Sequence, residues 1–374
     1  TVEYERDASS GNRWYDNGTG IASAEGPGHF GEYDYQHMNL IRNDLLAFTY
    51  TLVDQIYDPG ATASQVTTAL NGGRSIVNYC GHGSQTAWGT TGFSNTHVNA
   101  LVNDNMLPFI ISVACQNGNF ASGTCFAEAW LRAMHGTEPS GALATYMSSI
   151  DQSWNPPMDA QDEAVDLLRV QSKTTFGGIC FNGSCKMIDI NGSGGVSMFN
   201  TWHIFGDPSV QLRTGPALAM SVSHAAGIAL DATTFDVTVS EVVGALCALS
   251  NHGTLFGAAY TDATGSAVVP IEGTLPEGET VKLTVTAFNK ITYLADVFVM
   301  PLTPAPVEDL RVQVDGDELL LSWTSTGAAE YRLYSDSDPY GSFSTYRGAT
   351  SDTSIRVPII DEQLFFMVVS STGN

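Results

Sequence analysis

Two residues with reactive side chains, His82 and Cys115, each follow a short apolar segment and lie in a loop that contains glycine. The preceding segments, 75–79 and 107–114, have the length of buried strands. Ligands bind at the carboxyl ends of strands in open α/β sheets. A thiolate is a strong nucleophile that needs a base or a positive neighbour near neutral pH, and histidine supplies one. The pattern predicts a Cys115 nucleophile with a His82 partner, and backbone N–H groups of Gly83 and Cys115 as donors to an oxyanion.

Simpler interpretations of the same two residues stay open at this point. A buried cysteine commonly serves as a small apolar core residue, and a histidine beside glycine is often only a turn residue. A zinc site that uses His82 with Cys115 is disfavoured, because the Cys-x-x-Cys or His-x-x-x-His spacing of zinc sites is missing.

The charge balance limits the classes of partner. The chain has 39 acidic and 15 basic residues, for a net charge of -24. Binding to nucleic acid needs clustered lysine and arginine, so we expect no nucleic-acid partner. The same negative field would attract cationic substrates at low salt, although acidity can equally serve solubility or a saline habitat. No apolar run approaches the ~20 residues of a membrane helix, so we expect no membrane span.

Residues 1–214 alternate between strand-like and helix-like patterns, which predicts an α/β unit with a largely parallel sheet. Residues 34–48 carry apolar side chains at helical spacing, and 125–134 and 159–168 also indicate helices. A chain of 374 residues is expected to contain two or three domains.

Two all-β units are expected after this region. Residues 216–300 contain short alternating strands such as 234–239 and 281–288, the texture of a β-sandwich. A proline-rich linker is predicted at Pro301, Pro304 and Pro306. Residues 306–374 form a second β unit that resembles a fibronectin type III module, with Trp323 in its core.

Cys180 and Cys185 flank an Asn-Gly pair, the strongest two-residue hairpin signal. In such a hairpin these two residues would form a non-hydrogen-bonded pair, within reach of a disulfide. A disulfide would indicate an oxidising, extracytoplasmic setting. The alternative is a pair of half-buried free thiols.

Ordered matches through the first region resemble the gingipain-type cysteine peptidases of the caspase, legumain and gingipain group. The group pattern is His-Gly after one strand and Ala-Cys after a later one. The matching segments are 21–26, 31–37, 57–60, 71–73, 81–84, 86–89, 96–98, 107–110, 113–115, 117–118, 125–129, 150–152, 154, 156–158, 161–163, 175–178 and 205–209. The resemblance is closest to the arginine-specific branch. It implies a caspase-like α/β catalytic subdomain at 1–214 and an Ig-like sandwich at 216–300.

The resemblance also implies a role for each matching position. Cys115 would be the nucleophile, His82 the general acid/base, and Glu25 the residue that orients the imidazole. Asp34 would be the S1 carboxylate, which accepts a guanidinium bidentately, although a helix N-cap is the simpler interpretation of this residue alone. The other residues expected to line S1 are Gln152, Trp154 and Met158.

As a whole, the resemblance implies a secreted or cell-surface cysteine endopeptidase that cleaves after basic residues and prefers arginine at P1. It implies no catalytic cofactor, and structural calcium with ligands that cannot be assigned. The partners would be protein and peptide substrates. The family's catalytic unit normally has a further α/β subdomain before the position of Thr1, so an N-terminal polypeptide from the same precursor is also expected.

A catalytically silent binding or adhesion protein on the same scaffold is the alternative function. The presence of Cys115, His82 and Glu25 together favours the enzyme, because a silent relative has no physical need to keep all three.

Overall fold

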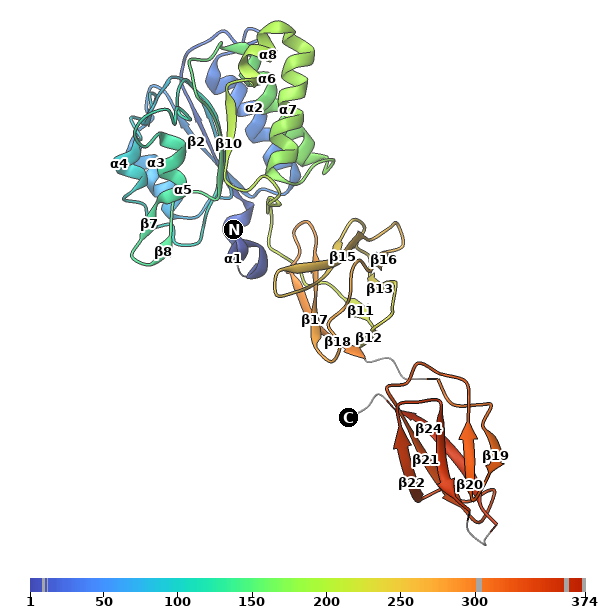
Figure 1. The fold of residues 1–374 in the computed structure, drawn as a ribbon. Helices are drawn as coiled ribbons and strands as arrows, with labels where there is room; N and C mark the ends of the chain where they lie inside the picture. The colour runs from blue at the N-terminus through green and yellow to red at the C-terminus, as the bar shows by residue number, and fades with distance from the viewer. Residues whose placement is uncertain (9–10, 12, 301–304, 360–362, 372–374) are drawn as a thin grey trace.

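The structure, a computed structural model, describes residues 1–8, 11, 13–300, 305–359 and 363–371. An α/β unit is followed along the chain by two β-sandwich units (Figure 1). The predicted linker residues Pro301 and Pro304 lie outside the described residues. No helix among the described residues has both the length and the apolar character needed to cross a membrane.

A six-stranded sheet forms the centre of the first unit, in the order β10-β9-β6-β3-β1-β2. All neighbouring pairs are parallel except the β10–β9 pair. Every residue of β3, β6 and β9 is buried, as expected where helices cover both faces of a parallel sheet. The strands are β1 (Asn17–Ala22), β2 (Leu52–Tyr57), β3 (Ile76–Cys80), β6 (Phe109–Val113), β9 (Ala144–Ser148) and β10 (Trp202–Phe205).

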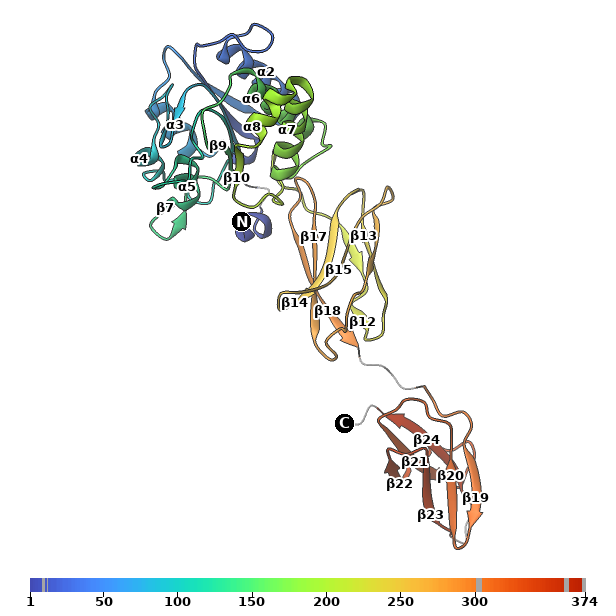
Figure 2. The same ribbon diagram turned by 45° about the horizontal axis from the view of Figure 1, so that its top comes forward.

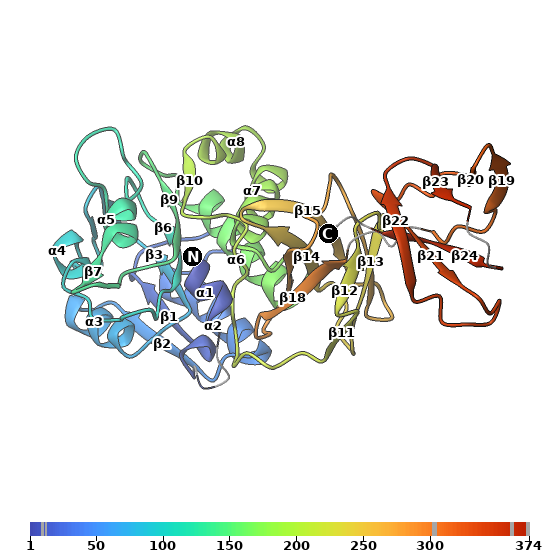
Figure 3. The same ribbon diagram turned by 60° about the horizontal axis from the view of Figure 1, so that its bottom comes forward.

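Two groups of helices enclose this sheet (Figures 1 and 3). One group is α2 (Asp34–Phe48), α6 (Asn155–Arg169), α7 (Phe176–Asn191) and α8 (Ser193–Phe199). The other is α3 (Ala63–Asn71), α4 (Asn95–Val98) and α5 (Phe126–Arg132). Each group buries its own apolar cluster against one face of the sheet. The predicted helix at 34–48 has these bounds in the structure.

The predicted hairpin and disulfide at Cys180 and Cys185 are wrong. Both cysteines lie within helix α7, and both are free thiols. Residues buried at helical spacing, including Phe176, Ile179 and Met187, override the Asn-Gly turn signal. Gly183 permits close packing instead, since a Cβ there would lie 2.4 Å from the Ala160 carbonyl oxygen of α6.

The remaining elements of the first unit are short. They are the helix α1 (Val2–Arg6), the 3-10 turn η1 (Arg13–Asp16), and the strands β4 (Gly83–Ser84), β5 (Ala87–Trp88), β7 (Met134–His135) and β8 (Glu138–Pro139). The β4–β5 hairpin begins one residue after His82 and fixes the loop that carries it.

The second unit is a sandwich of a three-stranded sheet, β11-β13-β16, and a five-stranded sheet, β12-β18-β17-β14-β15 (Figure 2). The strands are β11 (Val222–His224), β12 (Gly227–Ala229), β13 (Thr234–Val239), β14 (Leu246–Asn251), β15 (Thr254–Tyr260), β16 (Ser266–Pro270), β17 (Thr280–Thr286) and β18 (Tyr293–Met300). Strand β13 alternates strictly between exposed and buried residues. Arg213 of the first unit donates to the Lys290 carbonyl oxygen at 2.7 Å and so ties the two units together.

The third unit pairs two three-stranded antiparallel sheets, β19-β20-β23 and β22-β21-β24. The strands are β19 (Arg311–Asp315), β20 (Glu318–Ser322), β21 (Glu330–Asp336), β22 (Thr345–Thr350), β23 (Ser354–Pro358) and β24 (Phe365–Ser371). Trp323 and Tyr331 lie in its core, as predicted. The specific likeness to fibronectin type III stays a prediction.

Candidate active site

Four neighbouring parallel strands lead to the three predicted catalytic residues and to the predicted S1 residue Gln152 at one edge of the sheet. Strand β1 leads to Glu25, β3 to His82, β6 to Cys115 and β9 to Gln152. Because these strands are adjacent and parallel, their carboxyl ends meet at the same edge. We call this the edge rule, and it brings together residues up to 127 positions apart in the chain.

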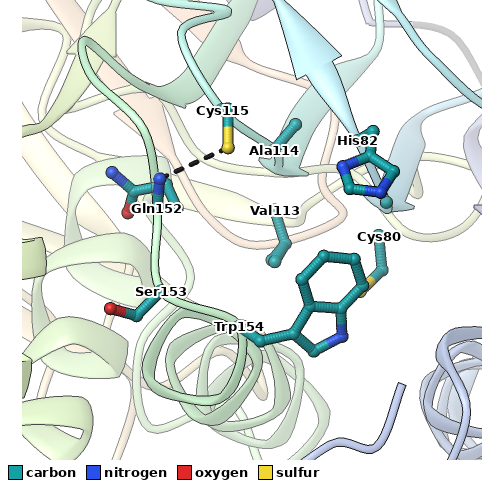
Figure 4. A pocket seen from close by; sticks show the side chains of 9 residues that line it. Cys80, His82, Val113, Ala114, Cys115, Gln152, Ser153 and Trp154 are labelled. Carbon is teal, nitrogen blue, oxygen red and sulfur yellow. Dashed lines mark hydrogen bonds between the residues drawn. The ribbon is translucent and has the colours of Figure 1, made fainter. Parts of the chain in front are cut away.

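A small pocket at this edge lies between His82 and Cys115 (Figure 4). The residues that line it are Cys80, Gly81, His82, Val113, Ala114, Cys115, Gln152, Ser153 and Trp154. The indole of Trp154 faces the two catalytic side chains from the other side of the pocket (Figure 4). Of the four residues expected in S1, Gln152 and Trp154 line this pocket, whereas Asp34 and Met158 do not.

Cys115 lies at a sharp turn that exposes its thiol to the pocket. The next residue, Gln116, has φ 59°, a left-handed conformation that costs a non-glycine residue on the order of 1–3 kcal/mol. Two bonds hold the turn: Gln116 N donates to the Ile150 carbonyl oxygen at 3.0 Å, and its side chain donates to Asp151 at 2.7 Å. The backbone N–H of Gln152 donates to Cys115 Sγ at 3.3 Å and so helps to fix the direction of the thiol.

His82 is held by its backbone and faces Glu25. Its carbonyl oxygen accepts from the Tyr79 hydroxyl at 2.6 Å and from the Gly89 N–H at 2.7 Å. Its Nε2 lies 3.4 Å from Glu25 Oε1, so Nδ1 is the ring nitrogen left for Cys115. Both side chains of the pair are more than half exposed, so the pair orients the ring more than it stabilises the fold.

Gly83 brings the histidine loop against the cysteine loop. A Cβ at this position would lie 2.6 Å from the Cys115 carbonyl oxygen and 2.8 Å from Ala114 Cβ. Only glycine permits this approach, which places the Gly83 backbone beside that of Cys115. This closeness is compatible with the predicted pair of oxyanion donors.

A buried asparagine to which the sequence analysis gave no role joins these loops. Asn117 is fully buried. Its Nδ2 donates to the Ser84 carbonyl oxygen at 2.7 Å, and its Oδ1 accepts from Ser112 Oγ at 2.8 Å. In the sequence, Asn117-Gly118 indicates only a turn.

The Asp34 carboxylate lies behind the pocket and is fully buried. It begins helix α2, and Tyr33 takes the N-cap position that was the alternative for Asp34. Its Oδ2 accepts from Ser23 Oγ at 2.5 Å, and its Oδ1 accepts from Trp154 Nε1 at 3.0 Å. Burial raises the pKa of Asp34, while hydrogen bonds from Ser23, Cys80 and Trp154 oppose that rise.

The other two predicted S1 residues are engaged elsewhere. The Gln152 side chain bonds to Ser148, and its Oε1 accepts from Trp202 Nε1 at 2.5 Å. Its backbone amide, not its side chain, faces the nucleophile. Met158 is 1% exposed and belongs to the core cluster of α2 and α6.

Ser23 and Cys80, of which Cys80 lines the pocket, are site residues to which the sequence analysis gave no role. Each stands at the carboxyl end of β1 or β3, and each hydrogen bonds to Asp34. The edge rule that located His82 and Cys115 would have located them, but neither side chain carries a catalytic signal on its own.

Within the part of the chain that the structure describes, no group of three or more His, Cys, Asp or Glu side chains is arranged to hold a metal ion. Structural calcium therefore finds no carboxylate cluster among those residues.

Comparison with known families identifies two matching regions. Residues 1–213 match peptidase family C25, and residues 223–300 match the C-terminal Ig-like domain of that family. Gingipain R2 of Porphyromonas gingivalis is 42% identical over 337 residues, which cover 87% of this chain and 46% of that protein. Gingipain R1 of the same species is 40% identical over 332 residues, which cover 86% of this chain and 33% of that protein. The chain thus spans about half or less of the length of these relatives.

Solved structures give the same result. The crystal structure of the Arg-specific cysteine proteinase gingipain R matches with a TM-score of 0.77 and 42% identity, over 80% of this chain and 70% of that one. A complex of the pro- and mature domains of RgpB from P. gingivalis matches with a TM-score of 0.77 and 41% identity, over 80% of this chain and 72% of that one. The chain belongs to peptidase family C25, and over most of its length it is similar to proteins of the gingipain R group.

Proposed function

We propose that the chain is the catalytic part of a cysteine endopeptidase that cleaves peptide bonds after arginine. The observation that carries the proposal is the arrangement of Cys115 and His82 around one pocket, with the buried Asp34 carboxylate behind it. A relative that shares 42% identity over most of this chain is described as an Arg-specific cysteine proteinase.

The chemistry assigns one task to each residue. His82 Nδ1 takes the thiol proton, and Cys115 Sγ attacks the scissile carbonyl carbon. The backbone N–H groups of Gly83 and Cys115 bind the oxyanion, and Glu25 stabilises the imidazolium. His82 then protonates the leaving amine, and water hydrolyses the thioester to free the enzyme.

Specificity rests on Asp34 and Trp154. A P1 guanidinium would replace Trp154 Nε1 at Asp34 Oδ1, where the two donors compete for one oxygen. The released indole could then stack on the planar cation. Arginine is favoured over lysine because only a planar fork can bond bidentately and stack at the same time. Gln152 and Met158 would complete the walls of S1.

A peptide library with every residue at P1 tests this function. We expect cleavage after arginine, with lysine at least about tenfold slower in kcat/KM. Cleavage mainly after lysine, asparagine or aspartate would contradict the specificity. No Cys115-dependent cleavage at all would favour the silent alternative.

The wider setting is also proposed. The domains are 1–214, 216–300 and 306–374, and the protein acts outside the cytoplasm. An N-terminal polypeptide from the same precursor packs against residues 1–214, which the complex of pro- and mature domains in a relative supports. Mass measurement of the natural enzyme would test this, since a single polypeptide equivalent to residues 1–374 would contradict it.

A further inference from the structure

Ser23 occupies a buried position where it contacts both the Asp34 carboxylate and the backbone of Glu25. It follows β1 directly and is 3% exposed. Its backbone N–H donates to the Cys80 carbonyl oxygen at 3.0 Å, which continues the pairing of β1 with β3 by one residue. The backbone of Ser23 is therefore fixed by the sheet, so its hydroxyl is presented in one direction.

The Ser23 hydroxyl closes a ring of three hydrogen bonds. The Glu25 N–H donates to Ser23 Oγ at 3.1 Å, and the Asp34 N–H donates to the Glu25 carbonyl oxygen at 2.9 Å. Since Ser23 Oγ accepts from an N–H, its single proton is free to donate to Asp34 Oδ2 at 2.5 Å. The ring thus has a defined direction when Asp34 is ionised.

The ring connects Asp34 and Glu25, which have separate roles in the proposed reaction. At one corner, Asp34 is the carboxylate that would bind the P1 cation. At the other, the Glu25 side chain lies 3.4 Å from His82 Nε2. Ser23 itself touches neither the substrate nor the reacting atoms.

We propose that Ser23 is a positioning residue that couples the filling of S1 to the activation of Cys115. The inference rests on the proposed arginine specificity. A guanidinium on Asp34 holds that carboxylate in one orientation, and Ser23 and the Glu25 backbone are held with it. Glu25 then stays beside His82, which keeps the imidazolium and the thiolate paired. Hydrogen bonds in such a chain also polarise one another.

The Ser23→Ala variant separates this coupling from the direct field of the cation. A cation at Asp34 acts through space on Cys115 and His82 whether or not residue 23 has a hydroxyl. An acceleration that depends on the Ser23 hydroxyl is therefore the signature of transmitted binding.

The test uses the whole chain, iodoacetamide as a neutral alkylating agent and N-ethylguanidinium as a filler of S1. The rate of alkylation at Cys115 is followed by the mass of the peptide that contains it, with and without the guanidinium. We expect the cation to accelerate alkylation severalfold in the wild type. In Ser23→Ala the acceleration should vanish, and in Ser23→Thr, which keeps the hydroxyl, it should return.

Ser75→Ala is the matched control. Ser75 is another buried serine of the same sheet, 2% exposed, whose hydroxyl bonds to the Tyr15 carbonyl oxygen at the opposite edge. This variant should keep the acceleration even if it melts earlier. If Ser23→Ala does not fold, Glu25→Gln should bind the guanidinium but lose the acceleration.

Binding is measured separately as the shift in melting temperature that N-ethylguanidinium causes. If the wild type shows no shift, arginine specificity fails and the coupling fails with it. If the cation binds but wild type and Ser23→Ala respond alike, the coupling is wrong and the proposed function stands.

Discussion

The carboxyl edge of the sheet in the first unit, which carries the candidate site (the site edge), differs from the sandwich of the second unit in the kinds of side chain that it buries. The sandwich buries a large apolar cluster, with Thr261 as a buried polar side chain, and strands such as β13 and β17 place buried residues at every second position. At the site edge, Asp34 and Asn117 are fully buried polar residues, and Asp34 carries a carboxyl group. Polar side chains are buried where they position reacting groups and are largely avoided where side chains only have to pack.

Replacing His82 by alanine should have the largest effect on the site edge. Without His82, no positioned base takes the proton of the Cys115 thiol and no acid protonates the leaving amine, so we expect kcat/KM to fall at least about a thousandfold. Val285→Ala is the matched change in the sandwich, where Val285 is fully buried. It should lower stability by about 2 kcal/mol and leave turnover per folded molecule unchanged. Steady-state kinetics with active-site titration would measure both, and equal losses of turnover would erase the contrast.

Asp34→Asn should affect function and stability in opposite directions. The loss of the carboxylate should lower kcat/KM for P1 arginine about a hundredfold and change neutral P1 substrates far less. Burial raises the pKa of Asp34, so the folded wild type is penalised for its charge at pH values above that pKa.

The variant should therefore melt higher than the wild type at neutral pH. The difference should shrink as pH falls through the raised pKa and the native carboxyl takes up its proton. Melting curves between pH 4 and 8 would show this dependence, and a variant that melts lower at neutral pH would contradict it. As a second readout, KM for P1 arginine should rise in the wild type as pH falls over the same interval.

The sequence predicted well wherever a signal was long or shared by several elements. The helix at 34–48, the parallel sheet and the meeting of His82 with Cys115 follow from periodicity and from the edge rule. The predicted hairpin at Cys180 and Cys185 was wrong because it rested on a two-residue turn signal alone. The packing of the buried residues of this segment against the rest of the unit favours a helix instead. Ser23, Cys80 and Asn117 could not be chosen from their types, since their roles depend on which backbone and carboxylate atoms they reach.

Gly183→Ala tests whether this glycine serves a turn or close helix packing. If Gly183 served a turn, alanine would disturb the local backbone. Because it lies within α7 against the Ala160 carbonyl oxygen, an added Cβ must instead push α7 away from α6. We expect a loss of about 1–3 kcal/mol of unfolding free energy in denaturant titrations. Gly194→Ala is the control, since nothing lies within 4 Å of a Cβ there. A Gly183→Ala protein as stable as this control would show that the close packing is not needed.

The central claim is that Cys115 is the nucleophile of an arginine-directed site. A peptidyl arginine chloromethyl ketone, which alkylates only a nucleophile that its P1 side chain brings within reach, tests it most directly. After reaction with the whole chain, a peptide map should show one adduct, on Cys115, and none on the other five cysteines. The matching ketone with P1 aspartate should leave Cys115 unmodified. An adduct on another cysteine, or equal labelling by both ketones, would contradict the account.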